Sequence, residues 1–377
     1  MKILTETKIS RKDWKWVGRY DIMSPDIISC SIGNTVLHES TKVMLPIEQK
    51  PLSGMRTLFC RMAYRAGRRV KEKKNRRHGR VGGIEMTEMR TLENAYLIVE
   101  VSDAGAELSR VYDKKKEREV LWNADPKYWG RHAPILFPFV GKLNGGVYHY
   151  EGNEYTMSAH GFARDSEFEC VERSATAVTH RLVSTGDTKK NYPFDFELLV
   201  THRLTENHIS VEWTVKNTDT KTLYYSIGGH PAFNVDSVMG CRLIFEGMDK
   251  LSCTGIDLPT GTADAEHPAT LALTDHVYTV GEHTFDADTM VFDEGQVKKV
   301  SLQEVDGTKR VTLICPDAQH VGIWSPVQKN APFICLEPWL GRCDNKGFTG
   351  ELKDKYGEQS LEAGKSFQTA YEIVVEK

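Results

Sequence analysis

The chain has 377 residues, of which 40% are hydrophobic, and a formal net charge of -3. This length and composition give ample material for a buried core, in one large domain or two ordinary ones, and exclude disordered and fibrous proteins. No apolar run approaches the roughly 18 residues that a membrane-spanning helix needs. The start, MKILTETKISRKDWKW, lacks the apolar stretch of a secretory signal. We therefore expect a globular protein that neither spans a membrane nor is secreted.

The eight cysteines are scattered along the chain, and no two form a C-x-x-C pair. A zinc ribbon or a thioredoxin-type site is therefore not indicated. Scattered thiols of this kind are typical of a reducing compartment, so we predict a cytoplasmic protein.

The first 84 residues differ in charge from the rest of the chain. They carry 19 Lys and Arg against 7 Asp and Glu, a charge of +12, whereas the remainder carries -15. They show no sustained periodicity and end in a self-repelling basic run, RAGRRVKEKKNRRHGRVGG. We predict that residues 1–85 are a poorly structured extension, or sequence upstream of a true start near residue 86, and that residues 86–377 form the folded domain. A nucleic-acid tether at residues 65–80 is less favoured, because no aromatic side chains interleave with the charges.

Beyond residue 93 the chain reads as many short strands with turn residues between them. Hairpin turns are indicated at Gly152-Asn153 and Glu206-Asn207. No segment has a convincing helical stripe. The predicted strand segments are 95–102, 105–113, 147–157, 196–219, 309–317, 320–326, 333–339 and 366–377. We predict an all-β fold, a large antiparallel sandwich or barrel, with function on its loops and concave face.

One cluster of potential metal ligands stands in the segment DHVYTVGEHTFDAD. It contains His276, His283, Asp286 and Asp288. The cluster lacks the ligand spacing of a calcium loop, and such clusters are usually solvated turns, so we predict no metal site there.

Three other stretches place an ionisable side chain where a β-run meets a turn residue. AHGFAR contains His160 and Arg164, IGGHPAFN contains His230, and ICLEPWLGRCD contains Glu337. Taken singly, a histidine at a turn is more often a surface or cap residue, and a glutamate after an apolar strand is more often a solvated strand end. The apolar neighbours of Glu337 argue against the second alternative, since desolvation raises the pKa of a carboxyl group toward neutrality. Together they offer a base and two acids without a nucleophile or metal, which indicates proton transfer on a neutral polar substrate.

Four tryptophans could supply the walls of such a site. Their flat apolar faces suit stacking on sugar rings, and burial in the core is an equally good interpretation. They are Trp122, Trp129, Trp324 and Trp339.

At these residues the sequence resembles the aldose 1-epimerase (galactose mutarotase) superfamily, and most closely its LacX-like branch. The resemblance rests on YWGRHAPILFPFVGKLNGGVYHYEGNEYTMSAHGFARDSEF, followed in order by GGHPAFN, FDADTMVFD and CLEPWLGRCD, and it spans residues 90–377. It implies a galactose mutarotase-like supersandwich of twisted antiparallel sheets as the catalytic domain, residues 86–377. It also implies a cofactor-independent isomerase that interconverts the α and β anomers of a hexose.

The resemblance also implies roles for individual residues. Glu337 would take the proton from the C1 hydroxyl of a cyclic aldose, and His230 would protonate the ring oxygen. His160 would hydrogen-bond the ring oxygen or a neighbouring hydroxyl. Arg131 would hold a sugar hydroxyl, and Trp339 would contact the sugar.

Two assignments stay open on the resemblance. Asp288 best matches the family's substrate-binding aspartate, with Asp286 as the alternative because both would lie on one side of a strand. The HGFAR form is shared with the branch that acts on hexose 6-phosphates, in which arginines hold the phosphate. Arg164 is therefore either a phosphate ligand or an ion-pair partner of Asp165 or another carboxylate. The alternative functions are a hexose-6-phosphate 1-epimerase and a non-catalytic carbohydrate-binding or sensing module on the same fold.

Overall fold

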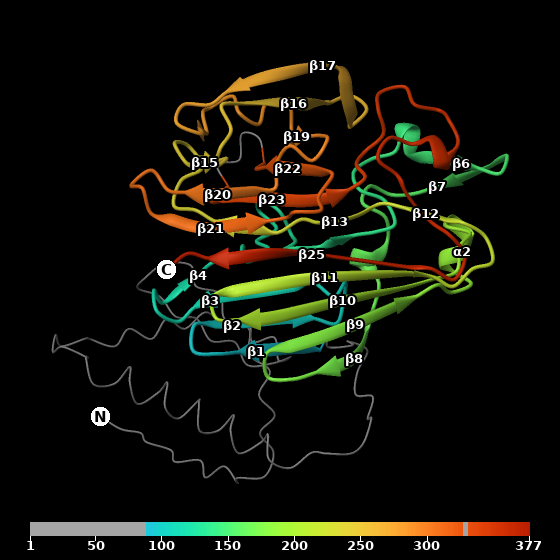
Figure 1. Cartoon of the computed structure of the whole chain (residues 1–377), viewed down its shortest axis with the longest axis horizontal. Helices are drawn as coiled ribbons and strands as arrows, with labels where there is room; N and C mark the ends of the chain where they lie inside the picture. Colours follow the sequence, from blue (N-terminus) through green and yellow to red (C-terminus); the bar gives the residue numbers. More distant parts are fainter. Residues whose placement is uncertain (1–87, 327–330) are drawn as a thin grey trace, which may run out of the picture. The chain divides into compact units, whose positions relative to one another are not determined.

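The computed structural model describes residues 88–326 and 331–377 (Figure 1). This part of the chain is built almost entirely of β-strands, as predicted. The expected basic extension and its boundary at residue 86 lie outside the described residues. Helical structure in the described part is limited to four short turns, η1 (Asn144–Gly146), η2 (Ala163–Asp165), α2 (Thr188–Asn191) and η3 (Leu352–Asp354).

The larger of the two main sheets has nine strands, all paired antiparallel. It contains the predicted pair over 196–219, whose turn falls at Glu206-Asn207. In spatial order its strands are β18 (Val277–Thr279), β15 (Arg242–Ile244), β20 (Lys299–Gln303), β21 (Lys309–Ile314), β25 (Ser366–Val375), β11 (His208–Asn217), β10 (Phe196–Thr205), β9 (Ala177–Val183) and β8 (Glu169–Arg173).

The second main sheet has eight strands and is also antiparallel. Its order is β17 (Thr262–Ala272), β16 (Lys250–Asp257), β19 (Met290–Phe292), β22 (His320–Trp324), β23 (Phe333–Leu340), β13 (Ile227–Gly229) and β5 (Ile135–Leu136), with β14 (Ala232–Asn234) paired to β23.

Three smaller sheets complete the described part. The predicted hairpin over 147–157 is one of them. They are β1 (Met89–Glu93) to β4 (Arg118–Glu119), with β2 (Leu97–Ser102) and β3 (Leu108–Asp113) between; the hairpin β6 (Val147–Tyr150) and β7 (Asn153–Thr156); and the pair β12 (Leu223–Tyr225) and β24 (Gln359–Leu361).

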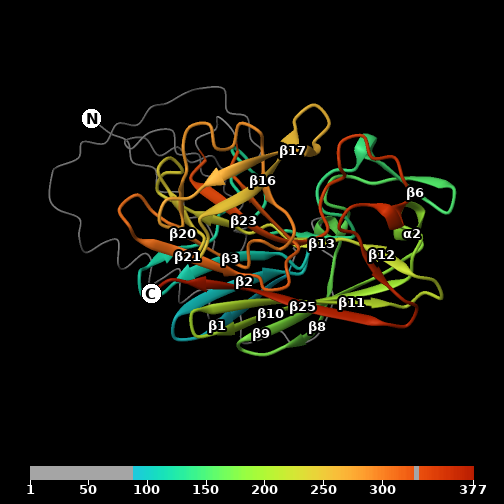
Figure 2. The ribbon, with the colours of Figure 1, turned by 45° about the horizontal axis from the view of Figure 1, so that its top comes forward.

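The sheets stack in layers around one main core (Figures 1 and 2). Strands β10 and β11 alternate buried and more exposed side chains, which is typical of a sheet with one face on the core. Val99 and Val111 of the four-stranded sheet join the same core as Val178 and Val200 of the nine-stranded sheet. In contrast, every residue of β23 is buried, so the eight-stranded sheet is covered on both faces at its centre.

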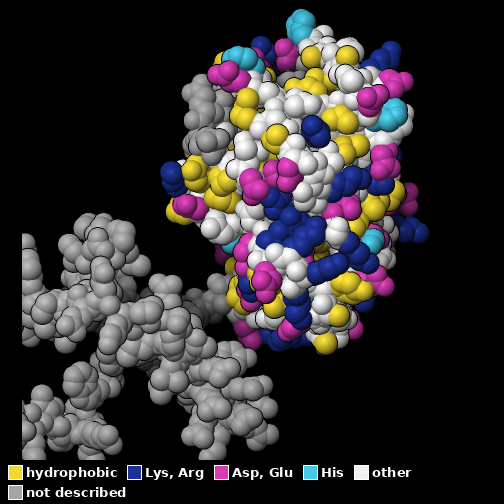
Figure 3. Space-filling model, turned by 90° about the vertical axis from the view of Figure 1, so that its left-hand side faces the viewer, with side chains coloured by type: hydrophobic (Ala, Val, Ile, Leu, Met, Phe, Trp, Pro, Cys, Tyr) yellow, Lys and Arg dark blue, Asp and Glu magenta, His cyan; other side chains and the backbone are white. Residues whose placement is uncertain are grey.

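Charged side chains cover much of the surface. Figure 3 shows one face of the described part, on which lysine and arginine side chains gather in a band across the middle. At β4, burial lowers the pKa of Arg118, and the nearby positive charge of Arg310 acts in the same direction.

In the stretches 88–326 and 331–377, no helix is long and apolar enough to cross a membrane.

Candidate active site

Strand β23 carries Glu337 and decides which way it points. Side chains alternate along a strand, and the even-numbered Ile334, Leu336 and Leu340 pack into the main core. The odd-numbered Glu337 and Trp339 therefore face the other side of the sheet, where they line a cavity.

This cavity has a volume of about 290 Å³, enough for a small molecule. Its wall combines three tryptophans, two histidines and two carboxyl groups with a few small residues from separate loops. The lining residues are Trp129, Gly141, Lys142, Ala159, His160, His230, Ile256, Leu258, Gly261, Asp288, Thr289, Trp324, Glu337, Trp339 and Cys343.

His230 and Glu337 face each other in this cavity. The His230 Nε2 lies 3.3 Å from the Glu337 Oε2, and the two side chains are 9% and 1% exposed. Burial raises the pKa of Glu337 well above its usual value, the charge of Asp288 adds to the rise, and the indole N–H of Trp339 acts in the opposite direction. Glu337 Oε1 has no hydrogen-bond partner in the described part of the chain, so one carboxyl oxygen remains available.

The ring of His230 is enclosed by aromatic groups. It stacks on Trp129 at a centroid distance of 4.6 Å and meets Trp324 edge-on at 5.7 Å. His160 also lies edge-on to it, at 5.7 Å. Burial lowers the pKa of His230 well below its usual value, and the neighbouring His160 acts in the same direction. Both effects favour the neutral imidazole.

The turn at His160-Gly161 explains why a glycine follows the histidine. Gly161 has φ +68°, and a Cβ there would lie 2.3 Å from the Phe137 carbonyl oxygen. His160 itself has φ +67°, a conformation that is strained for a non-glycine residue and recurs at functional sites. The Gly141 N–H donates to His160 Nδ1 (3.2 Å), and burial lowers the pKa of His160 to about 3. His160 is thus a neutral imidazole whose Nε2 carries the hydrogen.

Of the two candidate aspartates, Asp288 lines the cavity and Asp286 does not. The expectation that both lie on one side of a strand is wrong, because residues 282–287 form turns and Asp288 lies in a bend with φ +63°. Asp286 accepts a hydrogen bond from His283 Nδ1 at 2.8 Å on the exposed surface. The turn, not strand alternation, aims Asp288 at the cavity.

Arg131 and Arg164 are not among the lining residues of the cavity. Arg131 Nη2 donates to Asp165 Oδ1 at 2.6 Å. Arg164 Nη2 donates to the Ala159 carbonyl at 2.7 Å, and its Nε lies 3.7 Å from Asp165 Oδ2. The ion pair expected as one alternative for Arg164 is therefore present, and the charges of both arginines face Asp165.

The tryptophans divide between cavity and core. Trp129, Trp324 and Trp339 line the cavity, whereas Trp122 packs behind it, 4.6 Å from Phe333. Trp339 lies between glycines on the two neighbouring strands. A Cβ on Gly228 would lie 2.5 Å from the indole, and one on Gly322 would lie 2.3 Å from it.

These contacts predict that Gly322→Ala displaces the Trp339 ring. Overpacking of this kind costs about 1–3 kcal/mol, and here the neighbour that must move is a wall of the cavity. We expect a lower midpoint of thermal unfolding and a shifted tryptophan fluorescence spectrum. Gly186→Ala, whose Cβ would meet nothing within 4 Å, is the matched control and should change neither.

Several lining residues were not predicted from the sequence. Lys142 stands in the quoted run FPFVGKLNGG and Cys343 in CLEPWLGRCD, yet neither was assigned a role. Thr289 and Ile256 also line the cavity. Their positions depend on how distant segments meet, which no local pattern reveals.

One group of potential metal ligands exists in the described part of the chain. It consists of His230, Cys335 and Glu337, whose ligand atoms lie within 4.8 Å of one another. The segment 275–288, considered above as a metal cluster, contributes no such group among these residues. A cation bound there would occupy His230 Nε2 and Glu337 Oε2, the two atoms that lie 3.3 Å apart.

Comparison with known proteins identifies the family. The family model for aldose 1-epimerase matches residues 88–370. The chain belongs to the aldose 1-epimerase family. The chain is 32% identical over 275 residues to the plasmid-encoded protein LacX of Lactococcus lactis subsp. lactis. This match covers 70% of this chain and 91% of LacX.

Solved structures agree with this aldose 1-epimerase membership. A galactose mutarotase related enzyme from Lactobacillus acidophilus superposes with a TM-score of 0.73 at 31% identity, covering 77% of this chain and 98% of that one. A galactose mutarotase-like protein from Lactobacillus casei superposes with a TM-score of 0.72 at 31% identity, covering 77% of this chain and 100% of that one. The predicted galactose mutarotase-like fold and LacX-like branch are confirmed, and the protein is an isomerase of the aldose 1-epimerase type.

Proposed function

We propose that this protein interconverts the α and β anomers of a hexose by acid–base ring opening and reclosure. The observation that carries the proposal is the buried pair His230–Glu337, with Nε2 and Oε2 3.3 Å apart, in a cavity walled by tryptophans. The family supports the reaction class, and the residue roles below are our assignment.

The chemistry needs one base and one acid on the same hemiacetal. Glu337 takes the proton from the C1 hydroxyl, and His230 gives a proton to the ring oxygen. The C1–O5 bond breaks, the aldehyde forms at C1, and rotation about the C1–C2 bond presents its other face. Reclosure returns both protons by the same route, so nothing is consumed.

A single proton, shared between His230 and Glu337, lets the pair supply both the base and the acid. Burial raises the pKa of Glu337 and lowers that of His230, so both shifts favour the proton on the carboxyl group. Transfer from Glu337 to His230 gives the carboxylate and imidazolium that start ring opening. Ring opening then returns a proton to Glu337 and removes one from His230, which restores the neutral pair.

His160 acts as a hydrogen-bond donor in this scheme. Its Nδ1 accepts the Gly141 N–H, so its Nε2–H is free to donate to the ring oxygen or an adjacent hydroxyl. A pKa of about 3 makes it a poor proton carrier near neutral pH. Asp288 accepts from a sugar hydroxyl, and Trp339 offers its face to the ring.

A phosphorylated hexose is the second candidate substrate. Lys142 is the cation that lines the cavity in the described part, whereas Arg164 is directed to Ala159 and Asp165. A lysine ammonium suits a phosphate as a point charge.

We also propose a cytoplasmic location, supported by six free thiols in the described part.

Polarimetry tests the proposal. Freshly dissolved α-glucose, α-galactose and glucose 6-phosphate are each followed with and without the protein. We expect acceleration of at least one sugar, with acid–base groups supplying about 10²–10⁴-fold in the bound complex. Binding of a sugar without acceleration would instead indicate a sensing module, and a preference for glucose 6-phosphate would identify the phosphorylated substrate.

A further inference from the structure

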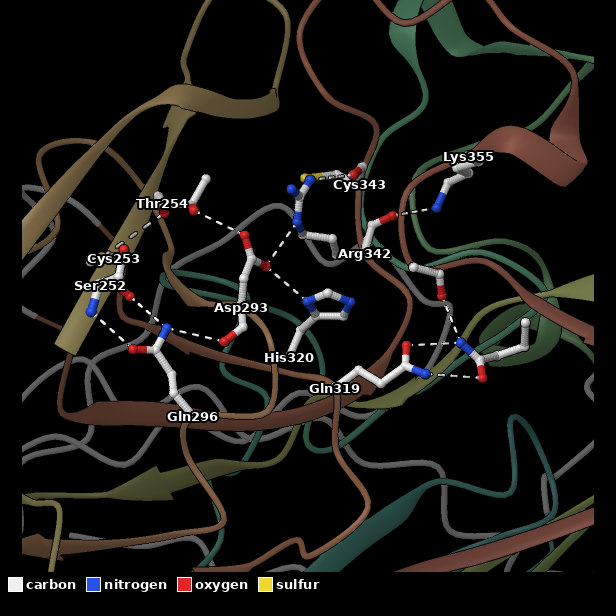
Figure 4. A network of polar contacts seen from close by, with 12 residues as sticks. Ser252, Cys253, Thr254, Asp293, Gln296, Gln319, His320, Arg342, Cys343 and Lys355 are labelled. Carbon is white, nitrogen blue, oxygen red and sulfur yellow. Dashed lines mark hydrogen bonds and ion pairs between the residues drawn. The ribbon is translucent and has the colours of Figure 1, made fainter. Parts of the chain in front are cut away.

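Asp293, directly after β19, is the centre of a buried polar network (Figure 4). Its carboxylate accepts three hydrogen bonds, from Thr254 Oγ1 (2.9 Å), His320 Nδ1 (2.8 Å) and Arg342 Nε (2.9 Å). Gln296 adds a backbone link, donating from Nε2 to the carbonyl of Asp293 at 3.0 Å. None of these residues lines the cavity, and the proton chemistry above does not use them.

Each of the three donors belongs to a segment that does line the cavity. Thr254 lies on β16, the strand of Ile256. His320 begins β22, which ends at Trp324. Arg342 immediately precedes Cys343, which lines the cavity. Asp293 itself is separated from Asp288, another lining residue, only by Thr289 and the short strand β19. The hydrogen bonds to one carboxylate therefore link four separate segments of the cavity wall.

The network also reaches His160 through the chain after β23. Arg342 Nη1 donates to the Cys343 carbonyl at 3.0 Å. Cys343 packs so closely on Gly141 that a Cβ there would lie 2.6 Å from the cysteine Cβ. Gly141 then holds His160 from both sides, since its N–H donates to Nδ1 and its carbonyl accepts the His160 N–H at 2.9 Å.

Stability alone does not account for this arrangement. The side chains of Asp293, His320 and Arg342 are 14%, 3% and 1% exposed, so all three are withdrawn from water. Burial raises the pKa of Asp293, but the hydrogen bond from His320 and the charge of Arg342 outweigh it and hold the pKa below its usual value. Buried ion pairs of this kind are often replaceable by well-packed apolar residues at no loss of stability, and in some proteins they are retained because they fix one geometry.

We propose that Asp293 is a positioning residue, which holds the Asp288, Trp324 and Cys343 walls of the cavity at the separation that a sugar ring requires. The inference rests on the proposed function for the identity of the ligand. The three side chains that donate to the Asp293 carboxylate include neither His230 nor Glu337, so loss of the network should loosen sugar binding more than proton transfer. The signature is a rise in KM at nearly constant kcat.

Thr254→Val is the sharpest variant, because it removes one hydroxyl at constant shape, and Thr254→Ser restores the donor. Asp293→Asn keeps the size but weakens the acceptor. We expect roughly tenfold higher KM for Asp293→Asn, which corresponds to about 1.4 kcal/mol of lost binding free energy, and a smaller rise for Thr254→Val. Thr254→Ser should return KM to the wild-type value.

Thr312→Val provides the matched control. Thr312 shares a buried hydroxyl contact of 2.6 Å with Ser301 on the nine-stranded sheet, away from the cavity-lining residues. It should lower the midpoint of thermal unfolding about as much as Thr254→Val while leaving KM unchanged. If Asp293→Asn and Thr254→Val lower that midpoint but leave KM within twofold of wild type, the network is only structural and the proposal is overturned.

Hydrogen exchange separates this inference from the proposed function. If the wild-type protein turns over none of the sugars, the proposed function fails, but the positioning role is still measurable. Asp293→Asn should then speed amide exchange in 254–258, 288–290 and 341–343, and Thr312→Val should not. Equal exchange in these segments for both variants would count against a positioning role.

Discussion

Glu337→Gln should reduce anomer interconversion by at least about 10²-fold, the lower end for loss of a general base. An amide has the shape of the carboxyl group but cannot take a proton from the C1 hydroxyl. Glu337 is 1% exposed and one of its oxygens has no partner, so an uncharged isostere fits the site without loss of contacts. We therefore expect the midpoint of thermal unfolding to stay unchanged or rise while the rate measured by polarimetry falls.

Glu304→Gln is the matched control for this variant. Glu304 is also buried, but it accepts a hydrogen bond from Arg310 Nε at 2.6 Å and lies beyond the end of β20. Weakening that charged contact should destabilise the fold without changing the rate per folded molecule. Near-full activity of Glu337→Gln would remove Glu337 from the mechanism.

The sequence reveals strands with one face on the core and the short apolar runs of the buried strands β22 and β23. The β10–β11 pair alternates over ten residues on each strand, and its turn was located at Glu206-Asn207. The β16–β17 hairpin was missed, because seven of the eleven side chains of β17 are exposed and leave no alternating pattern. An edge strand of this kind is specified by its partner and not by its own hydrophobicity.

The candidate site was predictable where a titratable residue interrupts an apolar run. Glu337 is flanked on β23 by buried residues on both sides, and His230 follows two glycines that the neighbouring side chains require. Asp288 was separable from Asp286 only in three dimensions, since a turn breaks the alternation that linked them. Asp293 stands in the quoted motif FDADTMVFD, but its partners lie 39, 27 and 49 residues away, and sequence distance hides the network.

A second large effect is expected from acid, through His202 on β10. His202 is fully buried, and neither ring nitrogen has a hydrogen-bond partner in the described part. Burial lowers its pKa to about 3, and the neighbouring His180 acts in the same direction. The unfolded chain takes up a proton at its ordinary pKa of 6.5, so between pH 6.5 and 3 it binds more protons than the folded protein. Stability is therefore complete above pH 6.5 and falls as the pH drops.

His202→Leu should remove this contribution. From the two pKa values, His202 lowers the free energy of unfolding by about 2 kcal/mol when the pH drops from 7.5 to 5. Urea unfolding at the two pH values should show a drop smaller by that amount in His202→Leu than in wild type. At pH 7.5 the variant should be at least as stable, because leucine leaves no unpaired polar atom in the core. His267→Leu, at a side chain that is 77% exposed, should keep the wild-type drop. An equal drop in His202→Leu and wild type would mean that His202 is hydrated or protonated in the folded protein, and the acid sensitivity would then have to come from the other buried histidines.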